Sequence, residues 1–195
     1  MNTRLSFAVL ASTLFLAFPA AAQWALSPDE SRIGFVSVKA GDFPESHYFG
    51  EMQGTVSQTG EAEITISLDS VETNIDIRNE RMREFLFETD KFPTATIAAA
   101  IDLDALNTMQ VGARKSVDFT GELTLHGASA PVETTLTLTR IAETRVLVET
   151  TDPVILYADQ FELSAGIKKL MELASLPSIT PAVPVAVSLV FEREK

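Results

Sequence analysis

The chain has 195 residues, no cysteine, 27 acidic and 15 basic side chains, and a hydrophobic fraction of 46%. Without cysteine it has no disulfide framework, no thiolate metal ligand and no cysteine nucleophile. The net charge of −12 argues against a nucleic-acid binder, because such a protein needs a basic surface to displace counterions from phosphates. The apolar fraction is too high for a disordered acidic chain, and the length suits a single domain.

The first 22 residues have the pattern of an export signal. A basic start precedes an apolar run from Leu5 to Phe18, and a proline and three alanines ending at Ala22 follow it. This order is typical of a secretory signal peptide. The run is shorter than the roughly 20 residues that a membrane-spanning helix needs, which weighs against the alternative of an uncleaved anchor. We therefore expect cleavage after Ala22, one mature domain over residues 23–195, and a periplasmic location.

Most of the remaining chain alternates apolar and polar residues with a period of two, which is typical of half-buried strands. The alternating apolar positions are Ile33 and Phe35; Ile64, Ile66 and Leu68; Val117, Phe119, Leu123 and Leu125; Val132, Leu136 and Leu138; Val146 and Val148; and Val183, Val185, Val187, Leu189 and Phe191. Turn residues separate these segments, so they predict an all-β, antiparallel sheet of about eight hairpin-connected strands. Closure into a β-barrel would hide the sheet edges, and a β-sandwich is the main alternative.

Two segments, residues 78–87 and 166–176, follow a helical period instead. Each places apolar side chains three and four residues apart on one face, and Pro177 stops the second. Asp76 or Asn79 is the expected cap of the first helix. We expect two short helices that cover the ends of the barrel.

The sequence carries only weak motifs for catalysis or metal binding. His47 and His126 are the only histidines, and neither lies in a His-x-x-His or Glu-x-x-His spacing. No Gly-x-Ser-x-Gly elbow or glycine-rich phosphate loop occurs, and Asp102 and Asp104 are interpreted as solvated loop charges. We therefore expect no catalytic residue, no metal site and no cofactor.

The aromatic residues are mostly phenylalanine, with 12 in the whole chain against one Trp and two Tyr. A side chain without a polar group suits a dry interior better than a wet contact surface. An eight-stranded barrel has just enough interior to be filled by side chains or to hold one small ligand. The aromatic inventory therefore leaves a packed core and a ligand cavity both open.

Three stretches carry distinctive motifs. They are Trp24 to Phe35, with a Pro-x-x-Ser and an apolar-x-Phe; Val71 to Pro93, with Arg78-Asn79-x-x-Met82 and Phe87-x-x-x-Lys91-Phe92-Pro93; and Gly121 to Gly127, with Gly-x-Leu-Thr-x-x-Gly. Together, and in this order, they resemble the YceI-like family of exported polyisoprenoid-binding proteins. The resemblance implies a lipocalin-like barrel whose hydrophobic interior holds a long isoprenoid chain, such as a polyprenyl lipid or the tail of a quinone. Some members accompany respiratory cytochromes, so a membrane respiratory cytochrome is a candidate partner.

Periodicity and family position together predict the ligand contacts. The expected interior residues are Phe35, Phe49, Met82, Phe85, Leu86, Phe92, Phe119, Leu123 and Phe161. Arg78, Asn79 and His126 are expected near a mouth of the barrel, where they would meet a polar head group. The chain departs from the family pattern at Tyr157 to Glu162, which lacks the family's Arg and Gly.

The function we expect is that of a non-enzymatic carrier, in which each methylene moved from water to the interior contributes about 0.8 kcal/mol. One alternative is a ligand-free structural or interaction module, which predicts no cavity larger than roughly 300 Å³. The other is a lipid-modifying enzyme, which predicts a titratable cluster inside the barrel. The alternating inward positions are almost all apolar, which counts against the enzyme.

Overall fold

The computed structural model describes residues 22–194. The predicted signal peptide lies outside the described residues except for Ala22, where the first strand begins. The strands are β1 (Ala22–Leu26), β2 (Arg32–Lys39), β3 (Phe43–Phe49), β4 (Met52–Ser57), β5 (Glu61–Ser67), β6 (Val71–Glu72), β7 (Thr94–Ala100), β8 (Arg114–Leu125), β9 (Ala128–Ala142), β10 (Arg145–Thr150), β11 (Val154–Tyr157) and β12 (Ala182–Arg193). The helical elements are η1 (Pro28–Glu30), η2 (Leu68–Ser70), α1 (Asp76–Arg81), the π-helical turn η3 (Met82–Phe87), α2 (Leu103–Asn107), η4 (Ala158–Phe161) and α3 (Ser164–Ala174).

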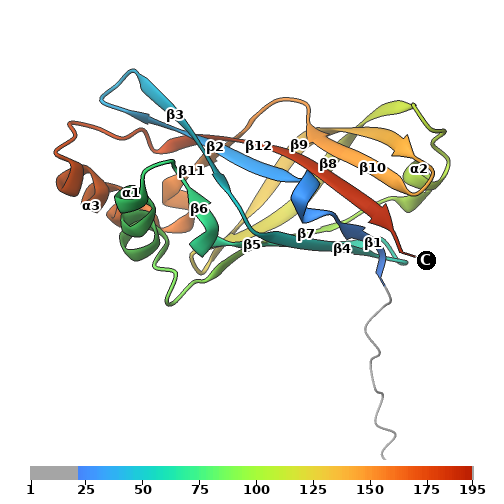
Figure 1. The fold of residues 1–195 in the computed structure, drawn as a ribbon, viewed down its shortest axis with the longest axis horizontal. Coiled ribbons are helices and arrows are strands. Elements are labelled where there is room, and N and C mark those ends of the chain that lie inside the picture. The colour runs from blue at the N-terminus through green and yellow to red at the C-terminus, as the bar shows by residue number, and fades with distance from the viewer. Residues whose placement is uncertain (1–21, 195) are drawn as a thin grey trace, which may run out of the picture.

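Eight of the strands form a closed antiparallel barrel (Figure 1). Their order is β1-β4-β5-β7-β8-β9-β10-β12, and β12 returns to pair with β1 through the register Trp24 to Arg193. The closure confirms the predicted antiparallel barrel and overturns the β-sandwich alternative. Closure also pairs β12 with β1, so that neither of these two strands leaves an open edge where they meet.

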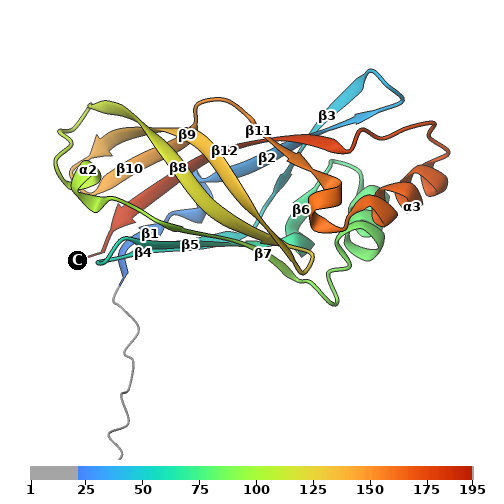
Figure 2. The same cartoon turned by 180° about the vertical axis from the view of Figure 1, so that it is seen from behind.

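The long strand β12 joins this barrel to a second part of the sheet. Its end, from Ser188 to Arg193, pairs with β10 and β1, whereas its beginning, from Ala182 to Ser188, pairs with β11 and β2. The sheet then continues from β2 to β3 and β6. The barrel wall is therefore extended at one end, where α1 and α3 lie together (Figures 1 and 2).

The helices differ from the prediction in number and place. Both predicted helices lie at the same end of the barrel, where α3 packs against η3, while the unpredicted α2 lies at the opposite end (Figure 1). Asp102 caps α2 by accepting a hydrogen bond from the Asp104 N–H at 2.9 Å, so these two acids help to begin a helix. With five residues, α2 is too short to give a periodic signal in the sequence.

The first predicted helix begins earlier and changes its winding. Neither Asp76 nor Asn79 caps it, because the N-cap position is Ile75 and no side-chain hydrogen bond is made there. After Arg81 the chain continues as the π-helical turn η3. A π turn brings residues four and five apart onto one face, so Met82, Leu86 and Phe87 are buried together.

Gly166 permits the close contact between α3 and η3. A Cβ added at this position would lie 2.5 Å from the carbonyl oxygen of Phe85 and 2.8 Å from the Cα of Leu86. These are backbone atoms, so no side-chain rotation relieves the contact.

Within residues 22–194, no helix combines the length and the apolar character that crossing a membrane requires.

Candidate functional site

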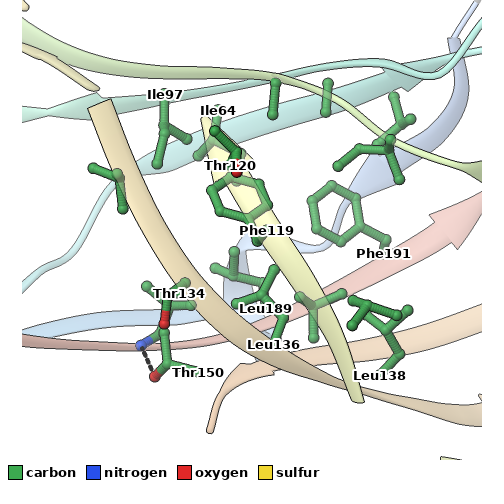
Figure 3. Close-up of a pocket in the computed structure, with 18 of the residues that line it drawn as sticks. Ile64, Ile97, Phe119, Thr120, Thr134, Leu136, Leu138, Thr150, Leu189 and Phe191 are labelled. Atoms are coloured by element: carbon green, nitrogen blue, oxygen red, sulfur yellow. Dashed lines mark hydrogen bonds between the residues drawn. The ribbon is translucent and has the colours of Figure 1, made fainter. Parts of the chain in front are cut away.

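The interior of the barrel contains a cavity of about 490 Å³, cavity 1. Figure 3 shows Phe119 of β8 and Phe191 of β12 projecting into the same space, with Leu136, Leu138 and Leu189 around them. Hydroxyl groups are few, and that of Thr150 accepts a hydrogen bond from the backbone N–H of Val187 at 3.2 Å. The lining is therefore a nearly continuous hydrocarbon surface, which suits an apolar ligand.

One edge of cavity 1 lies beside β8. The pairing of β7 with β8 stops at Ala99 and Gly121, and the first part of β8 pairs only with β9. Asp118, which alternates with the inward-facing side chains of β8, also borders cavity 1, as do Lys115 and Asp102. The charged border of cavity 1 therefore lies where β7 and β8 separate.

A second cavity of about 430 Å³, cavity 2, lies in the extended end of the barrel. Strands β2, β3 and β12 supply one side, and α1, η3 and α3 supply the other through residues such as Met82, Leu86 and Ile167. Two side chains, Ile66 of β5 and Leu123 of β8, line both cavities. The two cavities are therefore neighbours that adjoin at this pair.

Unlike cavity 1, cavity 2 has a polar cluster in its wall. Glu45 accepts hydrogen bonds from Lys39 Nζ and Arg78 Nη1, each at 2.7 Å. These bonds, first that from Lys39, hold the pKa of Glu45 below its ordinary value. Next to them Ser37 Oγ and His47 Nε2 lie 2.8 Å apart.

His47 is buried, with 3% of its surface exposed. Burial lowers the pKa of His47, and the positive charge of Arg78 lowers it further. Both effects disfavour the protonated form of the imidazole. Among residues 22–194, no group of three or more His, Asp or Glu side chains is arranged to hold a metal ion.

The structure brings seven of the twelve predicted site residues to the cavities. Phe119 and Leu123 line cavity 1, and Leu123 also lines cavity 2. The others in cavity 2 are Phe35, Phe49, Met82, Leu86 and Arg78. Arg78 lies in the polar cluster of cavity 2, where it pairs with Glu45.

Three predicted aromatic residues lie away from both cavities. Phe87, and not Phe85, lines cavity 2, because the π turn shifts the buried face of this segment by one residue. Phe161 is 1% exposed in η4, which packs against β9. Phe92 stacks on His126, with ring centroids 4.5 Å apart.

The two remaining polar predictions, Asn79 and His126, also lie outside both cavities. Asn79 Oδ1 accepts hydrogen bonds from the Thr73 N–H at 2.9 Å and the Thr73 Oγ1 at 2.6 Å, so it ties the start of the helix to β6. His126 occupies a left-handed position (φ 52°) at the β8–β9 turn, with its Nε2 3.1 Å from Glu88. Both side chains serve local structure.

The predicted ligand contacts were mainly aromatic residues and did not include many aliphatic side chains that line the cavities. The missed side chains include Ile33, Ile64, Leu136, Leu138, Val146, Val185, Val187 and Leu189. All of them are inward positions of the period-two segments, so the alternation itself carried the signal. Trp24, in contrast, lies in cavity 1 between Arg140 and Arg193, whose guanidinium carbons are 5.1 Å and 4.8 Å from its ring centroid.

A closed antiparallel barrel with apolar interior cavities defines the class of β-barrels that enclose a hydrophobic ligand. The family model that matches is the YceI-like domain, over residues 24–191. The chain therefore belongs to the YceI-like family, as its sequence motifs indicated.

Solved structures give the same assignment. A polyisoprenoid-binding domain from Saccharophagus degradans, implicated in plant cell wall breakdown, is 38% identical, with a TM-score of 0.88 over 89% of this chain and 100% of that chain. BcnA of Burkholderia cenocepacia is 18% identical, with a TM-score of 0.64 over 85% and 98%. The YceI protein of Campylobacter jejuni is 15% identical, with a TM-score of 0.56 over 76% and 84%. The last two show the fold alone, and comparison with curated proteins gives no match.

Proposed function

We propose that this chain is an exported, non-enzymatic carrier that holds a long isoprenoid lipid, either a polyprenyl lipid or a quinone, in its two cavities. The observation that carries the proposal is that an apolar cavity inside the closed barrel adjoins a second, largely apolar cavity in its extended end. The polyisoprenoid-binding name of the Saccharophagus degradans relative supports the same ligand class. The export signal predicted at residues 1–22 supports a periplasmic location.

The physical basis of binding is hydrophobic transfer. Each buried methylene contributes about 0.8 kcal/mol, so a chain of several isoprene units gains enough to offset the loss of its motional freedom. Each cavity also exceeds the roughly 300 Å³ at which ligand sites begin. A solid-core module does not account for this space.

The contacts of the interior polar groups favour a binding function over a catalytic one. In cavity 2 the carboxylate of Glu45 is occupied by Lys39 and Arg78, and His47 by Ser37. The lining of cavity 1 is hydrocarbon apart from a few hydroxyls and its charged border. Among the described residues, Glu45 and His47 are the only carboxylate and the only imidazole that line cavity 2.

The test is transfer of a labelled polyprenol from donor vesicles to delipidated protein. We expect a stoichiometric complex that survives gel filtration. The matched variant is Leu136→Asp, which places a charge in cavity 1, and Thr135→Asp, on the opposite face of β9, is its control. Uptake that fails in the wild-type protein, or that is equal in the two variants, would overturn the proposal.

A further inference from the structure

Apolar side chains gather on the outside of one end of the molecule. In the described part of the chain seven large hydrophobic side chains are exposed, and Phe43, Ile75 and Ile77, which are 59%, 44% and 53% exposed, are three of them. Ile75 and Ile77 border cavity 2, and their neighbour Arg78 donates to Glu45 of β3 at 2.7 Å. Phe43 lies two residues from Glu45 on the same face of β3, beyond the cavity. These three apolar side chains, here called the rim, therefore lie together at the outer edge of cavity 2.

The rim lies where the fold projects beyond the barrel. The hairpin of β2 and β3 and the helix α3 both extend from this end of the molecule (Figures 1 and 2). Ala40 and Gly41 turn the hairpin with positive φ angles of 52° and 87°, and a Cβ added at Gly41 would meet no atom within 4 Å. The tip beside Phe43 is therefore open to solvent, and a surface that approaches this end meets it before the barrel wall.

Charge is distributed unevenly between this end and the rest of the molecule. The three segments that surround the rim, residues 39–45, 76–87 and 164–179, carry six basic and six acidic side chains. The remaining described residues carry seven basic and 21 acidic side chains. All of the net negative charge of the described chain therefore lies outside the segments that surround the rim.

Apolar side chains on a neutral end favour a lipid bilayer as the surface that covers the rim. Exposed apolar patches bordered by polar residues are typical of protein or membrane interfaces. Near anionic lipids the acidic remainder of the molecule is repelled, so the charge distribution turns the neutral end toward the bilayer. Lys168 and Lys169 are exposed on α3 beside the rim, and their aliphatic stems suit the head-group region while the ammonium groups stay in water. Three apolar side chains are also few for a stable protein interface, which takes roughly 20–30 residues from each partner.

We propose that the rim docks on the head-group surface of a lipid bilayer, with Phe43, Ile75 and Ile77 inserted among the head groups and the acidic remainder of the barrel directed away. This inference goes beyond the proposed function, because adsorption to a bilayer requires no ligand in either cavity. Docking in this orientation places the outer edge of cavity 2 against the bilayer. An apolar ligand then reaches the barrel without crossing water.

The experiment measures co-flotation of the full chain with phosphatidylcholine vesicles. Phe43→Ser changes the rim residue that lies outside both cavities. Its control is Val111→Ser, because Val111 is 57% exposed, follows α2 at the opposite end of the barrel and also lies outside both cavities. We expect Phe43→Ser to lower the affinity for vesicles by about fivefold or more, and Val111→Ser by about twofold or less. Residues 1–22 are the same in all three proteins, so the difference between them reports the rim.

A second measurement reports which part of the chain touches the bilayer. Phe43→Trp keeps an aromatic side chain in the rim, and its emission should be quenched by phosphatidylcholine with brominated acyl chains. The emission of Val111→Trp should not be quenched. Trp24, the sole native tryptophan, is 1% exposed and gives the same background in both variants. The binding that Phe43→Ser loses should persist at about 0.5 M NaCl, because apolar insertion does not depend on charge screening.

The outcomes separate docking from the carrier function. Equal binding of Phe43→Ser and Val111→Ser, or equal quenching of the two added tryptophans, overturns the docking proposal. Loss of the binding at high salt overturns it as well, since cations would then drive adsorption. A wild-type dimer that Phe43→Ser converts to a monomer also overturns it, because the rim would then contact a second copy of the chain. A polyprenol added from ethanol should bind Phe43→Ser as it binds the wild-type protein, which shows that the variant is folded and leaves the carrier function standing if docking fails.

Discussion

Ile66 of β5 and Leu123 of β8 are the two side chains that line both cavities of the described barrel, so the cavities adjoin at this pair. Both side chains are 8% exposed, and both extend from strands that flank β7. A ligand that occupies both cavities would therefore contact these side chains. A ligand confined to one cavity need not.

This relationship predicts an effect of Leu123→Trp that depends on tail length. The larger side chain should lower the affinity for a long polyprenol by about tenfold or more, because a few excluded methylenes already cost that much. A short prenol that fits one cavity should lose about twofold or less. The measurement is a pair of binding titrations, and an equal loss for both tails would mean that ligands do not cross this point.

Gly166 gives a prediction about stability. Gly→Ala in a helix normally stabilises by about 1 kcal/mol, but here the new Cβ meets the backbone of Phe85 and Leu86. We expect Gly166→Ala to lower the free energy of unfolding by roughly 1–3 kcal/mol, the usual cost of overpacking.

Gly34→Ala is the control for Gly166→Ala, since its Cβ would meet only the His47 carbonyl oxygen, at an ordinary 3.5 Å. Urea denaturation should show a change of about 0.5 kcal/mol or less for this control. A Gly166→Ala protein as stable as the wild type would show that α3 is not held closely against η3.

Asn79 is predicted to act in folding and not in ligand recognition. Asn79→Ala leaves the buried N–H of Thr73 without its acceptor, which should cost about 1–3 kcal/mol in the free energy of unfolding. Asn79→Asp keeps the acceptor and is expected to cost less, although it faces the Glu72 carboxylate that Asn79 Nδ2 now bonds. If Asn79→Ala instead changed the relative affinity for charged and neutral lipids without a loss of stability, the head-group role would have to be restored.

The lowered pKa of His47 predicts how the free energy of unfolding depends on pH. Because burial and Arg78 lower the pKa of His47 in the folded protein, the unfolded chain, with a pKa of about 6.5, takes up a proton at higher pH. Stability should therefore fall as the pH drops from about 7.5 to about 5.5, and this component should be missing in His47→Gln. The stabilisation by Glu45, whose pKa is also lowered, is lost only as the pH falls below its ordinary value near 4.5, outside this window. Identical pH profiles for the two proteins would contradict this account.

The barrel and much of its interior were predictable from the sequence because the period of two directly encodes which side chains face inward. Phe35, Phe119 and Leu123 were placed correctly by that rule. The existence of two cavities was not predictable. The same alternation describes a filled interior, and only the packing of facing side chains such as Phe119 and Phe191 decides how much space remains.

The errors have identifiable physical causes. Phe85 was preferred over Phe87 because a helix of normal winding was assumed, whereas η3 is a π-helical turn. Asn79 was predicted to contact a head group, but its side chain bonds Thr73. The sequence does not show whether an amide side chain already has a partner within the protein. The cations Lys39 and Arg81 come from elements 42 positions apart in the chain, so their meeting in one cavity depends on the tertiary fold.

The most direct test of whether the barrel carries an isoprenoid lipid is mass spectrometry of the full chain purified without detergent. We expect a mass increment in the native spectrum and a polyprenyl species released by organic extraction. A protein that is empty as isolated and that also fails to take up added polyprenol or polyprenyl phosphate would contradict the carrier function.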